Sequence, residues 1–179
     1  ALEKLTGEKA LVVGPGIRTG LNIKIDNPAQ LGSDLVVDAV AGIAEYPLPL
    51  IIIDMGTATT MSAIDAAGNY LGGVIIPGVR VALDSMVSRT AQLPRISFEA
   101  PKKAIGKNTI ECMKSGSVFG SASMLDGMID RLEEELGQDA TVVATGGIAP
   151  FITPHCKHKI VCDDTLLLKG LYLIYNKNC

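Results

Sequence analysis

Ile51-Ile52-Ile53-Asp54-Met55-Gly56-Thr57-Ala58-Thr59-Thr60 is the stretch that decides the fold. Its β-branched run predicts a buried strand. The strand ends at a carboxylate, a glycine that lets backbone N–H groups approach a ligand, and hydroxyls that can donate to phosphate oxygens without adding charge. Alternating apolar residues resume up to a turn at 65–69. We therefore expect a hairpin whose turn faces a phosphate or a cation, although an ordinary hairpin with a Thr-rich bend has the same local pattern.

A helix is expected immediately before this hairpin. Apolar residues recur at helical spacing from Pro28 to Ala44. Asp34 falls in the first turn, where the helix dipole favours an ionised carboxylate. Asp34 and Asp54 thus form a candidate pair, one acid to accept a proton and the other to hold a cation. Asp34 has a simpler alternative role as an N-terminal capping group.

The rest of the chain predicts strands alternating with helices, which indicates an α/β fold. Strands are expected at 10–13, 70–76 and 141–144, and helices at 1–6, 79–88 and 164–175. A polar turn at 105–109 opens a long helix that is interrupted near 115–116 and that Gly137 ends. Small residues in this helix allow close packing against another helix or another subunit.

Composition excludes several classes of function. The formal charge is −3 with scattered Lys and Arg, so the basic face that nucleic-acid binding needs is not expected. Charges or glycines interrupt every apolar run before it reaches membrane-spanning length. Without a secretion signal, the four cysteines are interpreted as reduced cytosolic thiols. The spacing of His155, Cys156, His158 and Cys162 matches no standard zinc finger, so this segment is interpreted as a surface loop.

Eight segments resemble type III pantothenate kinases, in the order and spacing of that family and across essentially the whole chain. The most specific are 54–60 and the Gly-Lys-Asn-Thr run at 106–109. The others are 13–21, Leu31-Gly32-Ser33-Asp34, 70–73 with 77–78, 90–94, 115–116 and 145–147. Members of this family have also been labelled Bvg accessory factors, supposed transcriptional regulators.

The resemblance implies the acetate/sugar kinase–Hsp70–actin (ribonuclease H-like) fold, with an active site between two related α/β domains. Residues 1–48 would be the end of the first domain and residues 49–179 the second. The implied reaction is ATP-dependent phosphorylation of pantothenate to 4'-phosphopantothenate, the first step of coenzyme A biosynthesis. The implied protein is a cytoplasmic homodimer that binds neither nucleic acid nor membrane.

The resemblance also implies roles for individual residues. Asp34 looks like the general base, Asp54 like the ligand of an activating potassium or ammonium ion, and Thr57 like a contact to the phosphates of ATP, which would carry Mg²⁺. The other positions implied to contact pantothenate are Gly32, Ser33, Leu35 and Thr109.

The chain departs from the family pattern at two places. Family members begin with a strand and an Asp-x-Gly-Asn-Thr phosphate loop, which this sequence lacks, so we expect a fragment that binds ATP poorly and is inactive alone. The family also has Arg where Leu35 stands, and losing a charged hydrogen bond to substrate costs about 1.5–3 kcal/mol. Either another group compensates, with Arg18 and Arg89 as candidates, or the substrate is not pantothenate. These departures motivate the alternative of a non-catalytic relative with a binding or regulatory role.

Overall fold

The computed structural model describes residues 4–5, 7, 9–90 and 92–179. Its centre is a six-stranded sheet in the order β1-β4-β3-β2-β5-β6. The predicted hairpin is confirmed, because β2 (Leu50–Met55) pairs antiparallel with β3 (Ala58–Ile64). β4 (Asn69–Pro77) continues this meander. The parallel pairs are β2 with β5 (Thr141–Thr145), β5 with β6 (Ile160–Cys162), and β4 with β1 (Asn22–Ile23).

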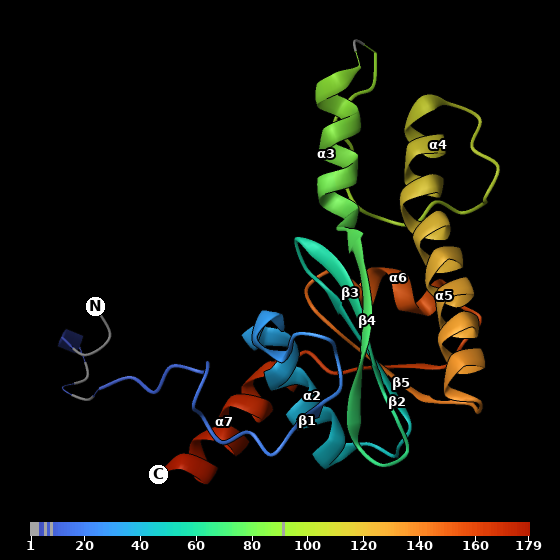
Figure 1. Cartoon of the computed structure of the whole chain (residues 1–179). Helices are drawn as coiled ribbons and strands as arrows, with labels where there is room; N and C mark the ends of the chain where they lie inside the picture. The colour runs from blue at the N-terminus through green and yellow to red at the C-terminus, as the bar shows by residue number, and fades with distance from the viewer. Residues whose placement is uncertain (1–3, 6, 8, 91) are drawn as a thin grey trace.

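Helices cover both faces of the sheet, which confirms the α/β prediction. α2 (Ser33–Glu45) and α7 (Leu166–Asn178) pack on one face, and α5 (Ser121–Leu136) and α6 (Ala149–Ile152) on the other (Figure 1). Side chains of β2 alternate between these layers: Leu50 and Ile52 face α2, whereas Ile51 and Ile53 face α5. Because both faces are covered, β2 is an unbroken apolar run up to its polar end.

Two helices extend beyond the ends of the central strands (Figure 1). α3 (Val79–Arg89) follows β4 directly, and α4 (Thr109–Ser115) leads through a π-helical segment, η2 (Gly116–Gly120), into α5. This segment lies where the sequence predicts an interruption of the long helix. Asn108 caps α4 by accepting a hydrogen bond from the backbone N–H of Glu111, and Gly137 ends α5 at a φ of 74°.

Some sequence predictions are wrong. Residues 10–13 form no strand, and Val12 is 76% exposed, because no strand of the described chain lies alongside to pair with them. The helix expected from Pro28 begins at Ser33, after a short 3-10 turn, η1 (Pro28–Gln30). The segment interpreted as a loop contains another 3-10 turn, η3 (Thr153–His155), and β6. The helix expected at 1–6 falls mostly outside the described residues.

The first 48 residues share the sheet of the remainder of the chain. β1 extends one edge of the sheet, and α2 packs between the sheet and α7. A domain boundary at residue 48 stays a prediction. Within the described part of the chain, no helix has the length and apolar character to cross a membrane.

Candidate active site

A cleft of about 450 Å³ lies between the start of α2 and the strands β3 and β4. The linker of residues 46–49 joins α2 to β2, so the helix runs back antiparallel over the strand, and its first turn reaches the polar end of the sheet. The cleft contains one carboxylate, Asp34, and no Lys or Arg among its lining residues. The lining residues include Gly32, Asp34, Leu35, Thr60, Ser62 and Tyr70.

Asp34 is exposed at the mouth of this cleft, in the first turn of α2. The N-cap is Gly32, which makes no side-chain capping bond, so the interpretation of Asp34 as the capping group is wrong. The hydroxyl of Ser33 does not serve the cleft, because its Oγ donates a hydrogen bond to the backbone oxygen of Val13 at 2.9 Å. The predicted substrate residues at 32, 34 and 35 are therefore together in the cleft, while the hydroxyl of Ser33 anchors the upstream segment.

Asp54 is the last residue but one of the strand β2, where it pairs with Thr60 on β3 and Thr145 on β5. Burial raises the pKa of its carboxyl, and the charge of Asp34 raises it further. The turn after β5 closes over it: Gly146 has φ 91°, and a Cβ there would lie 2.8 Å from Asp54 Oδ1 and 2.7 Å from the oxygen of Met55. Only glycine fits this position.

Thr57 lies in the tight connection between β2 and β3 and is exposed. Its backbone oxygen accepts a hydrogen bond from the N–H of Gly78 at 3.1 Å. A Cβ at Gly78 would clash with that oxygen at 2.2 Å. The N-cap of α3 therefore supports the loop that carries the predicted phosphate contact.

Sequence reasoning missed Asp38, which is only 2% exposed on the sheet-facing side of α2. Burial raises its pKa to about 7, and the charges of Asp54, Asp34 and Asp163 add to the shift. Its Oδ1 has no hydrogen-bond partner among the described residues, and neither has the buried Oγ1 of Thr60. The sequence offered one indication of a role for Asp38, because its spacing of four residues from Asp34 places both acids on one face of the helix.

A second buried acid, Asp163, ties three elements together behind this site. Its carboxylate accepts hydrogen bonds from Tyr46 Oη at 2.9 Å, Lys169 Nζ at 2.8 Å and Thr165 Oγ1 at 2.8 Å. Burial alone would raise the pKa of Asp163, but these hydrogen bonds outweigh it and lower the pKa to about 2. Lys169 also pairs with Glu45, so α7 is fastened to the end of α2.

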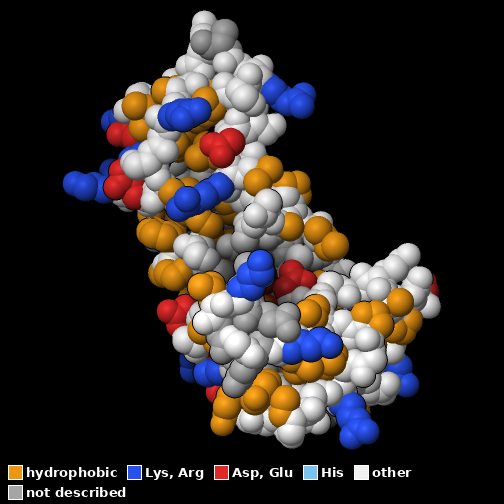
Figure 2. Space-filling model, turned by 90° about the vertical axis from the view of Figure 1, so that its left-hand side faces the viewer, with side chains coloured by type: hydrophobic (Ala, Val, Ile, Leu, Met, Phe, Trp, Pro, Cys, Tyr) orange, Lys and Arg blue, Asp and Glu red, His pale blue; other side chains and the backbone are white. Residues whose placement is uncertain are grey.

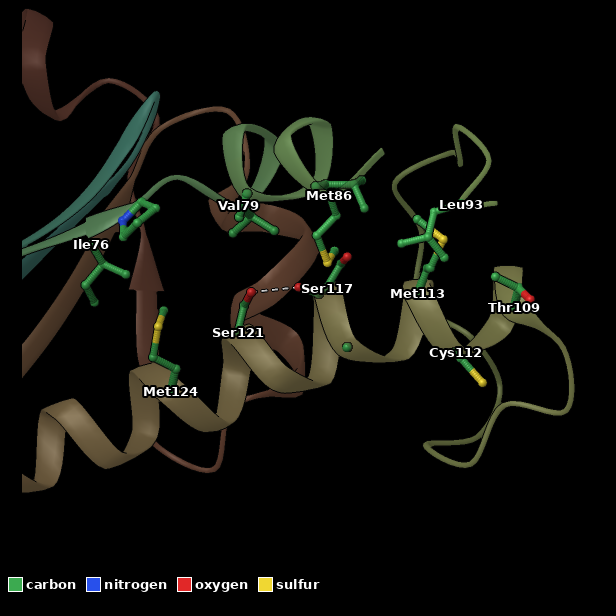
Figure 3. A pocket seen from close by; sticks show the side chains of 14 residues that line it. Ile76, Val79, Met86, Leu93, Thr109, Cys112, Met113, Ser117, Ser121 and Met124 are labelled. Carbon is green, nitrogen blue, oxygen red and sulfur yellow. Dashed lines mark hydrogen bonds between the residues drawn. The ribbon is translucent and has the colours of Figure 1, made fainter. Parts of the chain in front are cut away.

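Thr109 lies in a different pocket. A largely apolar pocket of about 540 Å³ separates α3 from α4 and α5, and Thr109 lines its outer end (Figure 3). The same view shows Met86 of α3 and Met113 of α4 on opposite sides of the gap. Within one chain, the structure does not place Thr109 in the cleft that holds Asp34.

The candidates for charge compensation also lie elsewhere. Arg18 exchanges backbone hydrogen bonds with the side chain of Asn178 at the end of α7, and Arg89 ends α3. Leu35 therefore has no cationic neighbour among the residues of the cleft. Figure 2 shows basic, acidic and hydrophobic side chains interspersed over one face of the molecule.

The histidines and cysteines near the C-terminal strand do not converge on one point. The ring of His155 packs edge-on against Phe119, whereas His158 Nε2 lies 2.7 Å from Asp130 Oδ1. Burial raises the pKa of the Cys156 thiol to about 12, which makes it unreactive. His158 does approach two acids of α5, Asp130 and Glu133.

Comparison with known proteins identifies the family. Residues 1–131 match the family model of type III pantothenate kinase. The type III pantothenate kinase of Bacillus cytotoxicus is 47% identical over 176 residues, which are 98% of this chain and 67% of the relative. A crystal structure described as a Baf family transcriptional activator from Campylobacter jejuni shares the fold, with a TM-score of 0.57 at 20% identity, over 87% of this chain and 68% of that one. This chain belongs to the type III pantothenate kinase family.

Proposed function

We propose that the protein transfers the γ-phosphoryl group of ATP to the hydroxyl of pantothenate, in the cytoplasm. Beyond family membership, one observation carries the proposal: Asp34 is exposed at the mouth of the cleft, while Asp54 ends the central strand behind it. A base at the surface of a cleft can reach a substrate hydroxyl. A half-buried carboxylate at the end of a strand suits a cation.

Each residue then has a defined task. Asp34 accepts the proton of the attacking hydroxyl, which makes that oxygen a better nucleophile toward phosphorus. Thr57, exposed at the hairpin turn, donates its hydroxyl to a phosphate oxygen of MgATP. Asp54 holds a potassium or ammonium ion, which supplies positive charge beside the phosphates. The orphaned Oγ1 of Thr60, directly opposite Asp54 on the neighbouring strand, fits such an ion.

The separate position of Thr109 supports a homodimer. If Thr109 contacts the pantothenate that Asp34 deprotonates, it comes from a second copy of the chain, because in one chain the two residues line different pockets. The exposed apolar side chains of α3 and α4, Val81 at 45%, Met86 at 44% and Ile110 at 46%, are suitable for such a contact.

The non-catalytic alternative is not favoured. A binding module needs no base, yet Asp34 is exposed at a cleft rather than used as a cap. Leu35, the residue that motivated this alternative, lines the same cleft, so its effect should fall on substrate affinity rather than on proton transfer.

The test is ADP release by the protein from its complete reading frame, with and without pantothenate, in potassium, ammonium and sodium buffers. Asp34→Asn should lower kcat by about 10²–10⁴-fold, the usual contribution of a general base. Asp139→Asn, an exposed acid in the turn after α5, is the matched control and should keep wild-type turnover. Absence of pantothenate-dependent ADP release in every buffer, from folded protein, would refute the proposal.

A further inference from the structure

The packing of α2 on β2 sets Asp38 over the end of that strand. Gly42 touches the strand closely, since a Cβ there would lie 2.7 Å from side-chain carbons of both Leu50 and Ile52. Asp38 is four residues back along the helix, about 6 Å. Asp54 is two residues beyond Ile52, about 6.6 Å along the strand. Because helix and strand are antiparallel, these two steps run in the same direction and bring Asp38 opposite Asp54.

Two buried oxygen atoms without hydrogen-bond partners in the described chain lie on this side of the sheet. Asp38 Oδ1 and Thr60 Oγ1 are both buried without a hydrogen bond among the described residues. Thr60 pairs directly with Asp54, so both side chains point to the α2 side of the sheet. Buried polar atoms are normally satisfied, and buried carboxylates are normally paired with a positive charge. A cationic ligand on this side of the sheet would satisfy both oxygen atoms and neutralise the carboxylates.

We propose that Asp38 is a second carboxylate ligand of the monovalent cation assigned to Asp54, and that Thr60 Oγ1 is a neutral ligand of the same ion. The inference rests on the proposed function for the presence of the ion, and it adds the ligands that enclose it. These residues offer only oxygen atoms, a donor set that suits a hard cation rather than zinc or copper. A bound cation would offset the negative charges of Asp38 and Asp54, which otherwise repel each other.

The experiment measures the cation itself. Equilibrium dialysis with radioactive rubidium, a substitute for potassium, is carried out on wild type, Asp38→Asn and Thr60→Val. Thermal unfolding is followed in potassium chloride and in choline chloride at equal ionic strength. Glu45→Gln is the matched control, because it removes one negative charge from the exposed end of the same helix.

Wild type should bind rubidium and gain thermal stability from potassium. Asp38→Asn should weaken rubidium binding about tenfold or more and abolish the stability gain, whereas Glu45→Gln should retain both. Thr60→Val should weaken binding less, since it removes an uncharged ligand. Equal rubidium affinity in wild type and Asp38→Asn would overturn the assignment, as would a wild type that binds no rubidium.

Failure of the proposed function is distinguishable from failure of this inference. Rubidium binding lost in Asp38→Asn supports the cation site even where no pantothenate-dependent ADP release is found. Conversely, turnover that depends on Asp34 with an unaltered rubidium affinity in Asp38→Asn upholds the kinase and removes Asp38 from the site.

Discussion

Replacing Gly170 with alanine should separate α7 from α2. Gly170 is buried in α7, and an added Cβ would lie 2.1 Å from the backbone oxygen of Val37 and 2.7 Å from its Cγ1. The nearest obstacle is main chain, so the two helices must move apart. Overpacking costs about 1–3 kcal/mol, and the better helix propensity of alanine returns about 1 kcal/mol. We therefore expect a net loss of up to about 2 kcal/mol in the free energy of unfolding.

Gly127 offers the same substitution without the obstacle. It also lies inside a helix, α5, but a Cβ there would meet only the guanidinium end of the Arg131 side chain, at 3.4 Å, an ordinary contact distance. Gly127→Ala should therefore stabilise the protein by about 0.5–1 kcal/mol. Urea unfolding of both variants, followed by circular dichroism, checks the pair. A Gly170→Ala midpoint that rises together with that of Gly127→Ala would refute the packing argument.

Three further predictions concern charge and assembly. The lowered pKa of Asp163, about 2 instead of 3.8, corresponds to about 2 kcal/mol of stability that is present above pH 4 and lost as the pH falls toward 2. Asp163→Asn should therefore make the urea midpoint less dependent on pH over that range. A pH dependence of the midpoint equal to that of wild type would contradict this. Leu35→Arg places a cation in the cleft and should lower the KM for pantothenate about 10-fold or more, with kcat little changed; steady-state kinetics would show an unaltered KM if the side chain does not meet substrate. Mixing inactive Asp34→Asn with Thr109→Ala protein should restore turnover through mixed dimers that hold one intact site, whereas no restoration after subunit exchange would place both residues in one chain's site.

The central hairpin and α2 could be predicted because their patterns are local. The apolar run of β2, its polar end and the helical spacing of residues 35–43 fix each element without knowledge of its neighbours. The error at residues 10–13 has the opposite cause, since an apolar run becomes a strand only beside another strand. β6 was missed because its three residues are too short to show a period, and pairing with β5 creates it.

The site could be predicted only in part, because motifs indicate residues that touch ligands and not residues that face one another. Asp34 and Asp54 stand at the ends of elements, where a polar residue is visible against an apolar background. Asp38 lies within the apolar stripe of α2, and whether it faces Asp54 depends on how the helix is aligned along the strand. The opposite holds for Thr109. Its motif is clear in the sequence, but only the tertiary structure shows that Thr109 and Asp34 line different pockets.

The charges of the cleft lead to a prediction that joins these residues. Pantothenate is an anion, the cleft presents Asp34 and no Lys or Arg, and Asp38 and Asp54 lie behind it. A bound monovalent cation offsets part of that negative charge, so the KM for pantothenate should rise in choline buffer. Leu35→Arg supplies a positive charge of its own, and the dependence of KM on potassium should therefore be weaker in this variant than in wild type. If potassium acts only on the phosphates of ATP, the potassium effect on KM for pantothenate will be absent in both proteins. Steady-state kinetics at a series of potassium concentrations, with ionic strength held constant, separates these two roles for the ion.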